Sequence, residues 1–159
     1  MNIYTSHPDE QSIEGTILRM QYLVDTVPTL LSQIPEPEFS QKPAPDKWSK
    51  KEILGHLIDS ATNNHQRFIR IQYQDKPSIY YDQNEWVSLS HYNSLEKNQI
   101  INFWAHYNSH LLHIIKNIPS DNLTKTGIVR TASEEKPLYF FINDYLAHME
   151  HHLRQIINY

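Results

Sequence analysis

Apolar side chains in the first part of the chain recur at alternating spacings of four and three residues, which predicts one face of an amphipathic helix. The helix starts after Ser12, and its apolar positions are Ile13, Ile17, Met20, Val24, Val27, Leu31 and Ile34. Pro28 lies within this pattern. Because proline lacks the N–H that a helix interior uses, we expect the helix to end or kink near Val27. Four further prolines, at positions 35, 37, 43 and 45, predict an extended linker that contains no helix.

Three later segments have the same helical periodicity. The first opens at Ser49, three residues before Glu52, which is the spacing of a capping box; its apolar stripe is Leu54, Leu57, Ile58, Ala61 and Phe68. For the next helix we expect Asn93 as cap with Glu96 as its partner, an end at Pro119, and an inward face of Ile100, Phe103, Trp104, Tyr107, Leu111, Ile114, Ile115 and Ile118. The last helix has Pro137 in its first turn and a stripe of Leu138, Ile142, Tyr145, Met149, Leu153 and Ile156.

The connections between these helices are long. Residues 74–91 are rich in aromatic side chains and have neither helical nor strand periodicity, so we expect an ordered loop there. Residues 120–136 are polar, and we expect at most a short strand pair around Gly127 to Thr131. Four helices without repeats or low-complexity segments predict one all-α domain over residues 1–159, a four-helix bundle. Periodicity leaves the order of the helices open, because long connections permit crossovers.

Composition and charge exclude several classes of site. The 159 residues include three glycines and no cysteine, so the chain itself provides no disulfide, thiolate metal site or thiol nucleophile. The net charge of −4 argues against a nucleic-acid partner. No apolar run approaches the ~18 residues that a membrane span needs, and Met1 to Glu10 lacks the features of a secretion signal. We therefore expect a cytoplasmic protein without a membrane span.

The chain is rich in histidine, with ten residues of a type that is both a common metal ligand and titratable near neutral pH. His148 and His152 lie one turn apart on the same face of the last predicted helix, so their imidazoles can converge on one cation. The alternative is a pair of solvated or hydrogen-bonded histidines at a helix C-terminus, where the helix dipole favours positive charge. Spacing alone leaves both interpretations open and slightly favours the second.

The other histidines give no ligand set by their spacing. His106, His110 and His113 share a face of the third predicted helix, but their neighbours on that face are polar, which indicates a solvated surface. His56 lies beside the apolar stripe of its helix, and periodicity does not select it as a ligand. No nucleophile motif, phosphate loop or dinucleotide fingerprint is present.

Three blocks of the sequence together resemble the DinB-like superfamily, particularly its YfiT-type branch of metal-dependent hydrolases and thiol transferases. The blocks are residues 48–60 (WSKKEILGHLIDS), 81–86 (YDQNEW) and 148–156 (HMEHHLRQI). The resemblance implies a bundle of up-down-down-up order, usually dimeric, with one divalent metal ion held by three histidines. In this sequence these are His56, His148 and His152.

The resemblance also implies a place for the aromatic connection, and helical spacing suggests a role for two acidic residues. Tyr80, Tyr81 and Trp86 should lie near the metal and shape a substrate pocket, although they could instead only close the end of the bundle. Glu52 and Asp144 precede His56 and His148 by one turn and are candidates to hydrogen-bond the ligands' outer nitrogens. Against this, Glu52 is also the expected capping-box partner of its own helix.

Three neutral imidazoles leave a coordination position open, which is the arrangement of a catalytic metal site. Zinc or nickel is the expected ion. It would activate a thiol for transfer to a small-molecule electrophile, or a water for hydrolysis of a small amide or ester. Since the chain has no cysteine, the thiol would come from a low-molecular-weight cosubstrate such as bacillithiol, mycothiol or glutathione. A third alternative is a non-catalytic, stress-associated binding or dimerisation module on the same fold.

Overall fold

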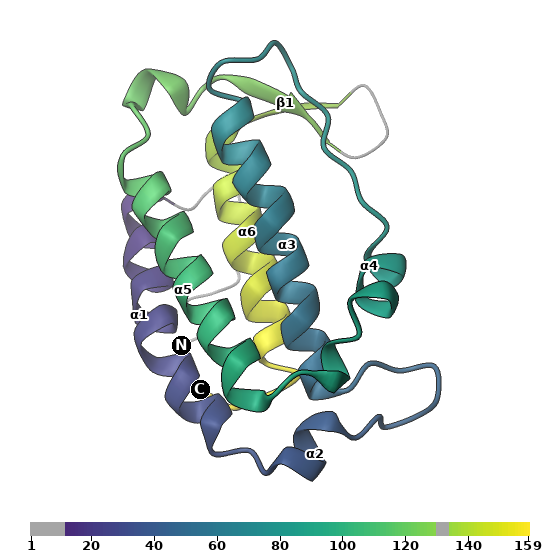
Figure 1. Ribbon diagram of the computed structural model, residues 1–159. Helices are drawn as coiled ribbons and strands as arrows, with labels where there is room; N and C mark the ends of the chain where they lie inside the picture. The colour runs from purple at the N-terminus through teal and green to yellow at the C-terminus, as the bar shows by residue number, and fades with distance from the viewer. Residues whose placement is uncertain (1–11, 130–133) are drawn as a thin grey trace.

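Four long helices form the body of the protein, which confirms the expected all-α bundle (Figure 1). The computed structural model describes residues 12–129 and 134–159. The long helices are α1 (Ile13–Ser32), α3 (Lys50–Arg70), α5 (Lys97–Lys116) and α6 (Leu138–Leu153). Shorter elements connect them: α2 (Glu36–Ser40), α4 (Gln83–Ser90), the 3₁₀ turns η1 (Tyr92–Ser94) and η2 (Ser120–Asn122), and the strands β1 (Thr126–Ile128) and β2 (Glu135–Pro137).

The helices follow the up-down-down-up order. Helices α1 and α3 each pack against both α5 and α6 (Figure 1). The hydroxyl of Thr16, near the start of α1, donates a hydrogen bond to the side-chain oxygen of Asn143, near the start of α6. These two helices therefore run parallel. By contrast, Lys97 at the start of α5 donates to the carbonyl oxygens of Ser32 and Ile34 beyond the end of α1, so α1 and α5 run antiparallel. Along α3, Ser60 lies at His148 and the later Arg67 lies at the earlier Phe141, so α3 runs antiparallel to α6. The second and third long helices therefore point one way, and the first and last point the other.

The core contains the apolar stripes expected from the sequence, with two exceptions, Val24 and Phe103. On α1, Leu23 rather than Val24 is fully buried. Met20, Leu54, Trp104 and Leu153 are fully buried on the four long helices. Phe103, expected to point inward, is instead 51% exposed and stacks on the ring of Tyr107. Successive side chains of a helix are about 100° apart, and the buried face of α5 that contains Ile101, Asn108 and Leu112 lies on the other side of Trp104 from Phe103.

The first helix does not end near Val27, and the prediction of a linker without helix was wrong. Helix α1 continues through Pro28 to Ser32, because Val27 and Leu31 extend its fully buried stripe, and this burial offsets the one hydrogen bond that proline removes. The linker that follows contains α2, in which Pro37 occupies the first turn, where a missing N–H costs little. Phe39 anchors α2 in the core.

The second connection also contains a helix where a loop was expected. Asp82 caps α4, and its Oδ1 accepts the backbone N–H groups of Asn84 and Glu85 at 3.0 and 3.1 Å. The next helix begins later than predicted, with Glu96 rather than Asn93 as its N-cap, because Asn93 lies in η1 and accepts a hydrogen bond from Ser49.

The remaining boundaries differ little from the sequence expectation. Pro137 is the N-cap of α6 rather than a residue of its first turn. Strands β1 and β2 pair antiparallel, with Gly127 opposite Lys136, as expected of this segment; positions 130 and 131 of the predicted pair lie outside the described residues. None of the helices in the described ranges is long and apolar enough to cross a membrane.

Candidate metal centre

Helix α3 presents His56 from a well-fixed first turn. The side chain of Ser49 accepts the N–H of Glu52, and Glu52 in turn accepts the N–H of Ser49, so the expected capping box is present. His56 follows one turn later, is completely buried and has the ring of Trp48 tilted against it at 5.0 Å. Helix α3 thereby holds one imidazole in a single position facing α6.

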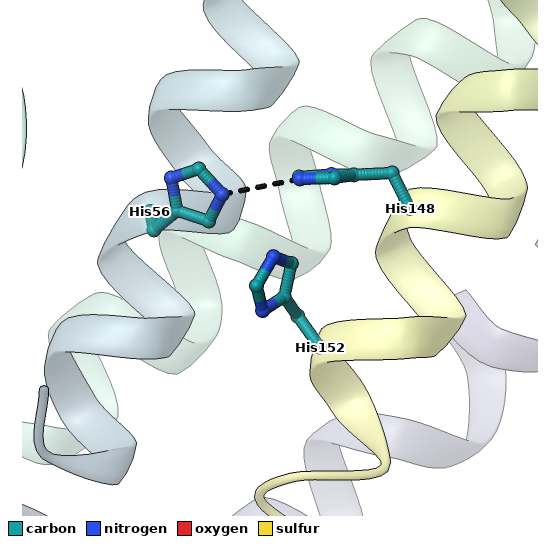
Figure 2. A group of neighbouring side chains, drawn as sticks. All are labelled: His56, His148 and His152. Atoms are coloured by element: carbon teal, nitrogen blue, oxygen red, sulfur yellow. Dashed lines mark hydrogen bonds between the residues drawn. The ribbon is translucent and has the colours of Figure 1, made fainter. Parts of the chain in front are cut away.

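Helix α6 presents the other two imidazoles to His56 (Figure 2). The rings of His148 and His152 lie 4.6 Å apart, and each lies within 5.0 Å of the ring of His56. One nitrogen from each residue falls in a cluster whose members are all within 4.8 Å of one another. Within the described ranges, this is the one group of three metal-ligating side chains so close together. The structure therefore brings together the three histidines that the family resemblance named.

The donor atoms fit a divalent metal ion. His56 Nε2 lies 3.1 Å from His148 Nε2, and bonds of ~2.0–2.1 Å in a tetrahedral site would place two nitrogen ligands about 3.3 Å apart. His152 Nδ1 lies 3.0 Å from the amide oxygen of Gln155; this contact places the proton on Nδ1 and leaves Nε2 as a lone pair. His56 Nδ1 is buried without a hydrogen-bond partner. The Nε2 of His56 has no hydrogen-bond partner among the described residues other than His148.

Burial keeps the three imidazoles in the neutral form that a metal ligand requires. Desolvation, together with the nearby His152, lowers the pKa of His56 to about 4. Desolvation and the neighbouring histidines lower the pKa of His148 to about 3. Burial also lowers the pKa of His152, although the hydrogen bond to Gln155 acts in the opposite direction. At neutral pH all three rings are therefore uncharged and available to a cation.

These pKa shifts predict an acid-sensitive fold in the metal-free protein. As pH falls below about 6.5, the unfolded chain binds protons first, because the folded-state pKa values of His56 and His148 are lower. Stability contributed by the neutral rings is therefore present above pH 6.5 and is lost as pH falls toward 4. We expect the free energy of unfolding to decrease by at least about 2 kcal/mol over this range, measured by urea denaturation in the presence of a chelator.

A variant isolates this effect from general acid denaturation. His56→Gln has no titrating group at this position and should lose less stability over the same pH range. Equal losses in the two proteins would contradict the assignment. Zinc added at pH 7 should raise the stability of the original protein and leave that of the variant nearly unchanged.

The outer partners of the imidazoles differ from those expected. Glu52 uses its two carboxylate oxygens on the Ser49 N–H and on Lys42, so it does not reach His56. His148 Nδ1 lies 3.4 Å from the hydroxyl of Ser60, and no hydrogen bond joins it to Asp144 in the described structure. The capping box explains the first difference. The second follows from the antiparallel packing of α3 on α6, which places Ser60 opposite His148.

A cavity of about 350 Å³ opens beside His148. The loop before α4 contributes Tyr80 and Tyr81 to its wall, as the pocket hypothesis expected. Trp86 is not among the lining residues and instead packs edge-on against Tyr81, with ring centroids 5.2 Å apart. The remaining lining residues come from α3, α6 and their neighbours: Ser60, Asn64, Arg67, Asp82, Gln83, Asn84, Val129, Phe140, Phe141, Asp144, Tyr145 and His148.

Sequence reasoning missed the polar face of α3 that leads from the histidines into this cavity. His56, Ser60, Asn64 and Arg67 follow one another at spacings of four, four and three residues, so they lie on one face of the helix. The first three are buried, and Ser60 and Asn64 are hydrogen-bonded to each other. The same periodicity that reveals apolar stripes would have found this polar one.

The histidines of α5 remain on the surface. His106, His110 and His113 are all exposed, as expected of a solvated face. His110 packs against the ring of His65 at 5.2 Å, and His65 Nδ1 lies 3.1 Å from the hydroxyl of Tyr107. This cluster contributes no third ligand, since the described structure groups only His56, His148 and His152.

Solved structures share this fold. YfiT from Bacillus subtilis, described as a probable metal-dependent hydrolase with an unusual four-helix bundle topology, matches with a TM-score of 0.78 and 18% identity over 93% of this chain and 87% of that chain. A mycothiol-dependent maleylpyruvate isomerase matches with a TM-score of 0.78 and 12% identity over 96% of this chain. The match spans 63% of the isomerase's own length.

The sequence itself matches a family. Among the curated proteins, no sequence is similar to this one. The sequence model of the DinB superfamily, however, matches residues 22–156, which include all three histidines and the connections between their helices. The chain therefore belongs to the DinB superfamily.

Proposed function

We propose that the protein is a metal-dependent enzyme that transfers a low-molecular-weight thiol to a small electrophile. The observation that carries the proposal is the convergence of three neutral imidazoles, His56, His148 and His152, beside a cavity that His148 lines. Three protein ligands leave room on a divalent ion for one more, which is how catalytic zinc sites differ from structural ones. Zinc or nickel is the proposed ion.

The reaction follows from this donor set. A divalent ion held by the three imidazoles lowers the pKa of a thiol or a water that binds beside them. The thiol gives its proton to solvent, its sulfur forms a bond to the electrophilic carbon, and the leaving group departs with the bonding electrons and takes up a proton. His148 fixes the reacting end at the cavity, and Tyr81 and Phe141 exclude water from its wall. With no cysteine in the chain, the sulfur comes from a cosubstrate.

The two solved relatives support this class of chemistry. One is described as metal-dependent and the other as mycothiol-dependent. The description of YfiT as a hydrolase also supports a second candidate function, in which a water takes the place of the thiol and a small amide or ester is cleaved. Both reactions would use the same imidazoles, and only the nucleophile differs.

Metal analysis combined with an activity screen tests the proposal. Purified protein is expected to contain close to one divalent ion per chain by elemental analysis, and the His152→Ala variant far less. The metal-loaded protein should consume thiol in a panel of low-molecular-weight thiols and alkylating electrophiles, and chelation should abolish this turnover. Metal-dependent ester or amide cleavage without thiol consumption would support the hydrolase. Bound metal without either turnover would favour a non-catalytic module.

We further propose that the protein is a homodimer. Its support is the exposed ring of Phe103 on α5, which stacks on the half-buried ring of Tyr107; Tyr107 in turn contacts His65 of α3. Large exposed aromatic side chains of this kind are enriched at interfaces between proteins. Light scattering coupled to size exclusion should give twice the chain mass, and Phe103→Glu should reduce it to that of a monomer. An unchanged mass in the variant would place the interface elsewhere.

A further inference from the structure

The cavity beside the metal centre contains two opposite charges that are not paired with each other. Arg67 from α3 and Asp144 from α6 both line it, and no salt bridge joins them in the described structure. Asp82 is the third charged residue in the wall, but its Oδ1 is engaged with the N-terminus of α4. A partly buried cationic side chain and an exposed anionic one therefore line the same open cavity.

Neutral groups hold Arg67 in place. Its guanidinium donates to the carbonyl oxygen of Ile79 at 2.7 Å and to the amide oxygen of Asn64 at 3.2 Å. Asn64 is buried and donates in turn to the backbone oxygen of Ser60 at 2.9 Å. These acceptors fix the direction of the guanidinium without neutralising it. An arginine so positioned has further N–H groups with which to bind a carboxylate.

The two charges lie at a defined distance from the imidazoles. Asp144 precedes His148 by one turn of α6, and Arg67 follows Ser60, the neighbour of His148, by two turns of α3. Since an α-helix rises 1.5 Å per residue, both lie roughly 5 to 10 Å along the bundle from the metal centre. The rings of Tyr81 and Phe141 line the space between, and the Arg67 guanidinium lies 6.0 Å from the Phe141 ring.

We propose that this cavity binds an ammonium–carboxylate head group, with the carboxylate on Arg67 and the ammonium on Asp144, in a ligand whose other end reaches the three histidines. The assignment rests on the proposed function and specifies its substrate class. A simple anion would bring negative charge next to Asp144, and a simple cation would bring positive charge next to Arg67. A zwitterionic head group satisfies both side chains and adds no net charge beside them.

Binding of S-methylglutathione to the metal-loaded protein tests this inference by calorimetry. Its sulfur is blocked, and seven bonds separate that sulfur from the α-carbon that carries the ammonium and carboxylate groups. Two analogues each lack one charge of the head group: the glutaryl analogue has no ammonium group, and the 4-aminobutyryl analogue has no α-carboxylate. All three probes keep the carboxylate of the C-terminal glycine, so the comparison isolates the head group. The protein is expected to bind the complete probe about tenfold or more tightly than either analogue, as the loss of a charge-assisted hydrogen bond implies.

Variants assign each charge to its partner. Arg67→Gln should bind the complete probe and the analogue without the α-carboxylate equally, and Asp144→Asn should bind the complete probe and the analogue without ammonium equally. Arg70→Gln is the matched control, because Arg70 lies on the same helix but bonds Gln74 and Gln66 outside the cavity. It should discriminate among the three probes as the original protein does. A merely structural role for Arg67 would weaken all three probes alike.

Three results would overturn the inference: no binding of the complete probe at 10 mM, equal binding of the three probes, or the same pattern in Arg70→Gln as in Arg67→Gln. The His152→Ala variant separates this test from that of the metal site. Because the probe has no free thiol, its head group should still bind this variant within about threefold of the original affinity, even if the variant holds no metal. If the metal proposal fails, binding of the probe will therefore still show whether the head-group site exists.

Discussion

Replacing His148 by alanine is expected to lower the affinity of the protein for zinc by about 100-fold or more. The substitution removes one of three imidazole donors, and changes even to groups that only support a ligand cost 10–100-fold. His148 is also the donor next to both His56, at 3.1 Å, and the cavity wall. Competition with a chromophoric chelator measures the affinity, and any thiol or water activation should disappear with the metal.

The surface histidine His106 provides the control for this prediction. It is exposed on α5 and lies outside the three-histidine cluster, so His106→Ala should bind zinc as the original protein does. A similar loss in both variants would show that zinc binds to histidines in general rather than to this centre. Unchanged affinity in His148→Ala would contradict the assignment of the ligands.

Replacing Gly55 by alanine is expected to destabilise the fold by about 3 kcal/mol, which is large for the addition of one methyl group. A Cβ at this position would lie 2.1 Å from the ring of Tyr92, which is nearly buried against α3. Tyr92 cannot simply move away, because its hydroxyl donates to Asp59, whose other oxygen is already buried without a partner. Its displacement would leave a carboxyl group buried without any hydrogen bond. Urea denaturation measures the loss.

Gly15 in α1 is a matched control within the same protein. A Cβ there would meet only the side-chain oxygen of Ser12, at 3.2 Å. Because alanine favours a helix over glycine by up to about 1 kcal/mol, Gly15→Ala should be neutral or stabilising. Equal effects at the two positions would indicate that helix propensity, rather than contact with Tyr92, decides the outcome at Gly55.

The long helices could be predicted because their apolar residues repeat over many turns. The errors fall where a local rule competes with burial. Pro28 predicts a helix break, yet α1 continues past it because Val27 and Leu31 are buried. Helix α4 is short and has a single buried residue, Val87, so its periodicity is weak. Asp82 followed by Glu85 was the available signal, and it is a capping pattern rather than a hydrophobic one.

The metal centre was less accessible to sequence reasoning than the fold. The spacing of His148 and His152 indicated a pair, but nothing local to His56 marked it as their partner. That relationship depends on α3 packing antiparallel to α6, which is a property of the tertiary structure. The resemblance to a family named His56. A polar stripe through Ser60, Asn64 and Arg67 is present in the sequence beside it, but the periodicity of apolar positions does not reveal it.

The contact between His56 and His148 joins positions 92 residues apart in the chain. A metal ion bound between them would act as a reversible cross-link that closes most of the protein into one loop, and such links restrict the unfolded chain more as the loop grows. The free ion concentration then sets the balance between folded and unfolded chains. A cell that limits the supply of this metal would thereby control the lifetime of the protein as well as its activity.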